Sequence, residues 1–279
     1  MIALITIPAT FFSLLSGENL IILIYKSNKF DDASVKLTFG IFKFHIIGLF
    51  AISANRIIAP AFYVNISYIK HSGVLVETKN SHFLFDYIGG ALPLLKQNTN
   101  IFVSHAHEDH FSSKIFSLPS KEIFLSDDIK SSKKVTLMAP DEYFEREDFT
   151  IHTFGSTDQG VSILLKTKEG IVFFAADLND WYWEEEDSHE DMIAMETAFL
   201  AEIRKASPYS INVLCFPVDP RLGTQYDKGA KKAIEILQPK AFLPIHFWKD
   251  YTLLKIFNEK YKHQCRILLP TEEGSVFSI

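Results

Sequence analysis

The pattern of hydrophobic and polar positions changes near Val64. Upstream, long stretches rich in Ile, Leu, Phe and Ala are broken by short polar segments. Downstream, short apolar runs alternate with turn residues, so residues 65–69 and 74–77, on either side of the turn His71-Ser72-Gly73, predict two strands. Residues 101–104 are almost wholly apolar, which is typical of a strand inside a sheet.

Helices are expected between the later strands. Helical spacing predicts a long amphipathic helix over residues 188–206, and its expected core-facing side chains are Met192, Met195, Phe199 and Ile203. Further helices are predicted near residue 114 and over residues 228–237 and 251–261. Further strands are predicted over residues 122–125, 134–138, 148–154, 161–166, 171–175, 213–216, 241–245, 266–269 and 275–279. Strands mixed with helices in this way predict a layered α/β sandwich.

Residues 1–63 are interpreted as an apolar N-terminal extension, and residues 64–279 as the folded domain. The extension never reaches the roughly 20 unbroken apolar residues that a membrane helix prefers, and it lacks the basic start of a signal peptide. Weak membrane helices, an extra helical layer and upstream sequence included by a misplaced start remain open. We favour a true start near Val64, where the ordered pattern begins. No methionine occurs between Met1 and Met138, so this start would use an alternative bacterial codon that is normally read as valine. A membrane anchor is the second choice.

Composition narrows the function classes. A formal net charge of -6 argues against a nucleic-acid binder, which would usually carry a basic face. The two cysteines, Cys215 and Cys265, form no CxxC pair, which excludes a Cys-rich zinc module and fits a reducing compartment. We therefore expect a cytoplasmic protein, with membrane association through residues 1–63 as the alternative. The chain has no P-loop, no dinucleotide-binding glycine motif and no Gly-x-Ser-x-Gly elbow.

Candidate chemistry is concentrated directly after the apolar run at residues 101–104. Four metal-binding side chains lie within six positions: His105, His107, Asp109 and His110. Imidazole nitrogens and carboxylate oxygens are the ligands that zinc and similar divalent ions favour. In a loop that leaves a strand, the first two histidines can point to one side while Asp109 and His110 reach a second point. One loop can therefore serve two adjacent metals.

The segment His-Ala-His-Glu-Asp-His at residues 105–110 resembles the His-x-His-x-Asp-His motif of the metallo-β-lactamase superfamily. Other strand ends resemble further motifs of that family: residues 83–86, 173–177 and 242–246. The resemblance runs from about Val64 to the C-terminus and implies a four-layer αββα sandwich with a metal pair at one edge. It implies as metal ligands His105, His107, Asp109, His110, the bridging Asp177 and His246. It also implies that Asp86 supports the metal loop from behind.

One turn departs from the family pattern. Ser156 stands where the family has a further histidine, and the Gly-Asp pair of the family has become Ala176-Asp177. The Gly-Ser-Thr-Asp turn resembles a bacterial branch of uncharacterised hydrolase-like members. The first metal position keeps His105, His107 and the shared Asp177. Candidates for the missing ligand are Asp158, His71, His152 and His189. An ordinary surface or supporting role is expected for each, and His71 is the best candidate among them.

The resemblance implies a hydrolase that uses a metal-bound hydroxide on an ester, lactone, amide or phosphoester of a small molecule. Asp109 would also orient the nucleophile. The expected cofactor is a pair of zinc ions, with one zinc ion, manganese or iron as alternatives. Trp181 and Trp183 line either the substrate pocket or a packed aromatic cluster, and Arg221 contacts either an anionic substrate or a structural partner. A metal-binding member with little hydrolytic activity, such as a sensor, is the alternative. The sequence does not define the substrate or the oligomeric state.

Overall fold

The computed structural model describes residues 64–279, and what is predicted for residues 1–63 lies outside them. The chain divides into two units, residues 1–60 and 61–279, and all described residues belong to the second. None of the helices within residues 64–279 has both the length and the apolarity needed to cross a bilayer. The division of the chain near Val64 into extension and domain stays a prediction.

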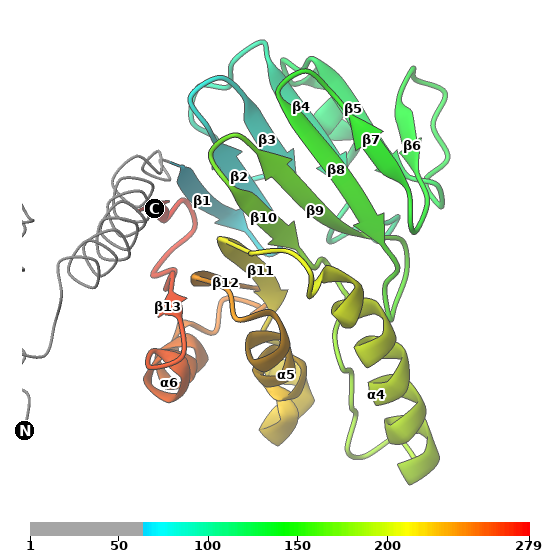
Figure 1. Ribbon diagram of the computed structural model, residues 1–279, viewed down its shortest axis with the longest axis vertical. Coiled ribbons are helices and arrows are strands. Elements are labelled where there is room, and N and C mark those ends of the chain that lie inside the picture. The colour runs from blue at the N-terminus through cyan, green and yellow to red at the C-terminus, as the bar shows by residue number, and fades with distance from the viewer. Residues whose placement is uncertain (1–63) are drawn as a thin grey trace, which may run out of the picture. The chain divides into compact units, whose positions relative to one another are not determined.

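Two seven-stranded sheets form the described domain (Figure 1). The first contains, in spatial order, β14 (Val276–Ser278), β1 (Asn65–Lys70), β2 (Gly73–Glu77), β3 (His82–Phe85), β4 (Thr99–Val103), β5 (Glu122–Ser126) and β6 (Thr136–Met138). The second contains β13 (Arg266–Ile267), β12 (Ala241–Ile245), β11 (Val213–Pro217), β10 (Ile171–Phe174), β9 (Ser162–Thr167), β8 (Phe149–Phe154) and β7 (Tyr143–Glu145). The central pairs β3–β4–β5 and β10–β11–β12 are parallel.

The core lies between the two sheets. Phe85 of β3 stacks on Phe174 of β10 with ring centroids 4.9 Å apart. The residue between two such inward positions, Leu84, belongs to a second apolar cluster on the other face of the first sheet. Side chains of a strand alternate between its two faces, so the unbroken apolar strands are buried on both.

Helices cover the second sheet more fully than the first. Helix α5 (Lys228–Leu237) and helix α6 (Tyr251–Tyr261) contribute buried residues to the main core, and Phe257 of α6 lies 5.1 Å from Phe242 of β12, measured between ring centroids. On the first sheet, the short 3-10 helix η1 (Ser113–Ser117) and its neighbouring loops form the outer layer of the described residues. The predicted layered α/β sandwich is confirmed.

Helix α4 (His189–Ile203) is less buried than its pattern predicts. A capping box between Ser188 and Asp191 starts the helix, and the 3-10 helix η2 (Arg204–Ala206) follows it. Phe199 and Ile203 are buried as expected, but Met192 and Met195 are only half-buried. The expectation that both methionines face the core is wrong, because the N-terminal half of α4 extends past the core (Figure 1).

Candidate metal centre

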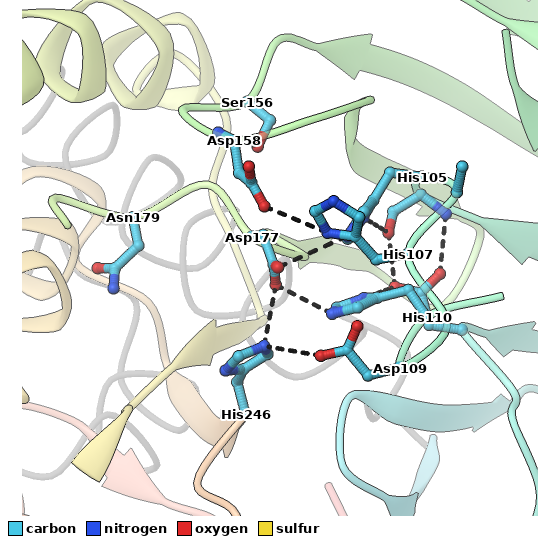
Figure 2. Close-up of polar contacts among 12 residues, drawn as sticks. His105, His107, Asp109, His110, Ser156, Asp158, Asp177, Asn179 and His246 are labelled. Carbon is cyan, nitrogen blue, oxygen red and sulfur yellow. Dashed lines mark hydrogen bonds and ion pairs between the residues drawn. The ribbon is translucent and has the colours of Figure 1, made fainter. Parts of the chain in front are cut away.

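The candidate metal ligands lie at one edge of the two sheets, where several strands end. The loop after β4 carries residues 105–110, and the ends of β10 and β12 lead into Asp177 and His246. Because β10 and β12 run parallel to the strand β11 between them, their carboxyl ends meet at the same edge. Figure 2 shows these side chains pointing toward one another from separate elements.

Backbone strain is concentrated at this edge. Four residues at or just beyond strand ends have positive φ angles: His71 (53°), Asp86 (42°), Ala176 (50°) and His246 (59°). Such angles are uncommon for residues other than glycine, and they gather where surrounding structure enforces a functional geometry. The positive φ of Ala176 gives a physical reason for the glycine that the family places before its bridging aspartate.

Two groups of potential ligands converge at this edge. The first contains His105, His107, Asp158 and Asp177, and the second contains His71, Asp109, His110 and His246. Within each group, one donor atom per residue lies within 4.8 Å of every other. In the first group, Nδ1 of His107 is 3.4 Å from Asp158. In the second, Nε2 of His71 is 3.2 Å from Asp109 and Nε2 of His246 is 3.7 Å from it.

Asp177 lies between the two groups. Its Oδ1 is 3.1 Å from Nε2 of His110 and 3.6 Å from Nε2 of His246, both in the second group. Its Oδ2 is 3.6 Å from Nε2 of His105 in the first group. One carboxylate therefore faces both groups, which is the position a bridging ligand requires.

Several donor atoms of this centre have no hydrogen-bond partner among residues 64–279. Within the described residues, four buried atoms here lack a hydrogen-bond partner: Nε2 of His71, His110 and His246, and Oδ1 of Asp177. Buried polar atoms without partners are costly and rare in folded proteins. A divalent ion at the second group would satisfy all four atoms, because Oδ1 of Asp177 also faces that group. The first group adds a separate set of nitrogen and oxygen donors that suits a second ion.

A second layer of carboxylates orients the histidines from behind. Asp86 is fully buried and accepts hydrogen bonds from Nδ1 of His110 at 2.7 Å and from the backbone N–H of Ser104 at 2.8 Å. Asp219 is also fully buried and accepts from Nδ1 of His246 at 2.9 Å. Such contacts fix the ring orientation and leave Nε2 free for a metal. The sequence indicated Asp86 but did not assign Asp219 to His246.

The charges of the centre are coupled. The imidazoles of His246 and His71 hold the pKa of Asp109 far below its usual range. Burial alone would raise the pKa of Asp177, but His110 and His246 lower it well below normal. Burial alone would lower the pKa of His110, but Asp177 and Asp86 raise it to about 10. Metal ligands bind as neutral imidazoles and carboxylates, so cations and protons would compete for this centre.

The departing turn places an aspartate, and not Ser156, in the first group. The Ser156 hydroxyl accepts the backbone N–H of Asp158 at 3.2 Å and is absent from both groups. The Thr157 hydroxyl donates to the carbonyl of Asn179 and accepts its N–H at 2.9 Å, which ties the turn to the loop after Asp177. The preference for His71 as the replacement in the first group is wrong, because His71 lies in the second group. Among the other candidates, His152 instead contacts Tyr209, and His189 lies in neither group.

A cleft of about 450 Å³ opens over the two groups. Trp181, Trp183, Met195 and Arg221 line it together with ligand candidates such as Asp109. The indole N–H of Trp181 donates to the backbone carbonyl of Asp177 at 3.0 Å, so this residue is a fixed wall that is only 7% exposed. Trp183 stacks beside it with ring centroids 6.3 Å apart. The two tryptophans therefore both line the cleft and pack on each other.

Comparison with known proteins decides the family. Residues 65–246 match the model of the family described as "Beta-lactamase superfamily domain", and this range is more than half of the chain. The chain belongs to the metallo-β-lactamase superfamily of metallo-hydrolases.

Solved structures agree in fold with this member of the superfamily. Igni18, a metallo hydrolase from the archaeon Ignicoccus hospitalis, superposes with a TM-score of 0.58 at 17% identity over 78% of this chain and 98% of its own. CmlA, a diiron β-hydroxylase from Streptomyces venezuelae, gives 0.52 at 12% identity over 77% of this chain and 54% of its own. At these identities the likeness shows the fold alone.

Residues 1–68 match a different family model, that of the lipid II flippase MurJ. A curated relative, the probable lipid II flippase MurJ of Treponema pallidum, is 48% identical over 63 residues. That stretch is 23% of this chain and 12% of the flippase, so the chain spans only a small part of the relative's length. The sequence did not predict a flippase-like segment.

Proposed function

We propose that residues 64–279 are a metal-dependent hydrolase domain acting on an ester, lactone, amide or phosphoester bond of a small molecule. The observation that carries this proposal is the pair of ligand groups sharing Asp177 beneath an open cleft. When bound, a pair of divalent cations lowers the pKa of a water molecule and polarises the bond under attack.

The proposed ligand sets follow from the two groups. His105, His107 and Asp158 would hold the first ion, and His71, Asp109, His110 and His246 would hold the second. Asp177, which faces both groups, would serve both ions. Nitrogen and oxygen donors without sulfur suit zinc, manganese and iron. Zinc is our first choice for the imidazole-rich second position. CmlA, which shares the fold, is described as a diiron enzyme, so iron is retained as the alternative.

Asp109 is proposed as the catalytic residue. It lines the cleft, and its lowered pKa keeps it a carboxylate at neutral pH. A carboxylate in this position can accept a hydrogen bond from the attacking water and aim it at the substrate. Asp86 and Asp219 are positioning residues that hold His110 and His246 in place.

Metal counting combined with a substrate panel tests the proposal. We expect about two ions per chain after loading with zinc, manganese or iron, and hydrolysis of at least one class among lactones, phosphodiesters and thioesters. Bound metal with no turnover on the panel would instead favour a metal-binding sensor. Asp158→Ala should lower the affinity for the first ion by at least about 10-fold, as loss of metal-site partners commonly does. Asp148→Ala, which removes a carboxylate of similar exposure elsewhere, should not.

We also propose that residues 1–63 are separate from the hydrolase domain, consistent with the change of pattern near Val64 and with the flippase match. A shortened chain that begins at Val64 should be soluble and should bind the same number of ions as the full chain. Failure of the shortened chain to fold would show that residues 1–63 are an integral part of the domain.

A further inference from the structure

Arg221 lies at the rim of the cleft between two aromatic rings. Its guanidinium carbon is 5.5 Å from the ring centroid of Trp183 and 4.8 Å from that of Trp248. The 3-10 helix η3 (Pro220–Gln225) carries the arginine, and Asp219 caps this helix by accepting the backbone N–H of Arg221 at 2.9 Å. The side chain is therefore held in one place at the cleft, although it is 47% exposed.

Asp219 engages only one edge of the guanidinium. Nε of Arg221 donates to Asp219 at 3.0 Å and Nη2 donates at 2.6 Å. A guanidinium has five N–H donors in a planar fork, and no other side-chain acceptor for them is found within the described residues. The end formed by Nη1 and Nη2 is thus left with donors for a ligand, in the geometry that matches two oxygens of one carboxylate or phosphate.

Once cations occupy the two ligand groups and offset the carboxylates of the cleft, Arg221 is a side chain there that offers donors to an anion. Among the described residues that line the cleft, Arg221 is the one with a permanent positive charge. The carboxylates of Asp109, Asp158 and Asp177 belong to the two ligand groups, and none of them forms an ion pair with Arg221. An anionic group entering the cleft would meet the arginine without displacing a partner.

We propose that Arg221 binds an oxyanion of the substrate, a carboxylate or phosphate remote from the bond that is cleaved, while Trp183 and Trp248 flank an adjoining apolar part. The inference rests on the proposed hydrolase function and narrows its substrate class to anionic amphiphilic small molecules. Arg221 is then a residue that determines specificity. The two rings near the guanidinium attract its positive charge and help to keep it in this position.

The competing interpretation is that Arg221 only supports Asp219 and, through it, His246. Asp219 accepts from both residues through Oδ2, so removal of the arginine reaches the ligand group as well. Binding of an anion and retention of metal must therefore be measured separately on the same variants.

The test is the binding of two matched probes to the metal-loaded full chain, followed by tryptophan fluorescence. All three tryptophans of the chain line this cleft or the adjoining pocket around Trp248, so the emission reports on the site. Cyclohexanecarboxylate should bind the wild type, and Arg221→Gln should weaken it by about 10-fold or more, as loss of a charged bidentate contact predicts. Cyclohexanecarboxamide has the same shape without the charge, and the affinity for it should change by less than about 2-fold in the same variant. Cyclohexyl phosphate in a parallel arm distinguishes the two oxyanions.

Controls separate recognition from support. Arg221→Lys keeps the charge but loses the planar fork, so it should show most of the loss for the carboxylate. Lys249→Gln removes a neighbouring cation that pairs with Glu273 and should leave both probes unchanged. The proposal is overturned if Arg221→Gln weakens both probes equally or sheds its metal, and also if it changes neither probe. Anion binding without turnover on any substrate would refute the hydrolase function and leave the recognition role intact.

Discussion

His110→Ala should abolish turnover of whichever panel substrate the wild type hydrolyses. The imidazole lies 3.1 Å from Asp177 and 2.7 Å from Asp86, so its removal deletes one donor of the second group and leaves two buried carboxylates facing an empty space. A metal ion at such a centre contributes several kcal/mol to the reaction, and about 4 kcal/mol corresponds to about 1,000-fold in rate. We expect a loss of at least this size.

The measurement is the initial rate at saturating metal, together with the metal content after dialysis. His152→Ala is the matched control, because this half-buried histidine of β8 contacts Tyr209 and belongs to neither group. It should retain both the rate and the metal. A His110→Ala protein that turns over at the wild-type rate would remove the second ion from the proposed mechanism.

Gly160→Ala should destabilise the domain far more than another glycine substitution at a comparable backbone angle. Gly160 has a φ of 68°, and a Cβ there would collide with the carbonyl oxygen of Ser104 and the Cβ of His105. The neighbouring Val161 donates its N–H to that same Ser104 carbonyl at 3.0 Å, so the turn cannot move away without breaking this bond. A positive φ costs an alanine roughly 1–2 kcal/mol, and overpacking adds roughly 1–3 kcal/mol.

Gly274→Ala provides the comparison for this prediction. Gly274 has a φ of 86°, and a Cβ there would meet no atom within 4 Å, so only the backbone cost applies. Denaturant unfolding should show a loss of about 2–5 kcal/mol for Gly160→Ala and about 1–2 kcal/mol for Gly274→Ala. The Gly160 variant should also bind its first ion more weakly, because the turn carries Asp158. Equal losses of unfolding free energy in the two variants would show that the turn around Gly160 relaxes to make room for the added methyl group.

Local sequence spacing predicted the metal loop better than it predicted the turns around it. Residues 105–110 lie in one loop, so their spacing along the sequence already indicates that their side chains lie close together. Asp177 and His246 lie far along the chain, and only the resemblance to the superfamily brought them into the site before the structure did. Positions of the family's metal ligands can therefore be assigned in this sequence where the ligands follow strands that end at the same edge of a sheet.

The replacement of the missing histidine was harder to predict, because it depends on the path of a turn. The sequence put Ser156 at the position of the histidine and left Asp158 among four candidates for the missing ligand. The contacts of Thr157 with Asn179 hold the turn in which Asp158 reaches His107. His71 illustrates the same difficulty, since its positive φ directs it to the second group. Asp219 gave a signal that was not used: it follows β11, the parallel neighbour of the strand that leads to His246.

The ligand groups draw on both sheets. Residues 71 and 105–110 follow strands of the first sheet, while Asp158, Asp177 and His246 follow strands of the second. Bound ions would therefore link the two sheets of the sandwich to each other at this edge. Ions that bind only the folded chain add to its stability by mass action. The supply of metal in the cell would then set how long the domain resists proteolysis as well as whether it is active.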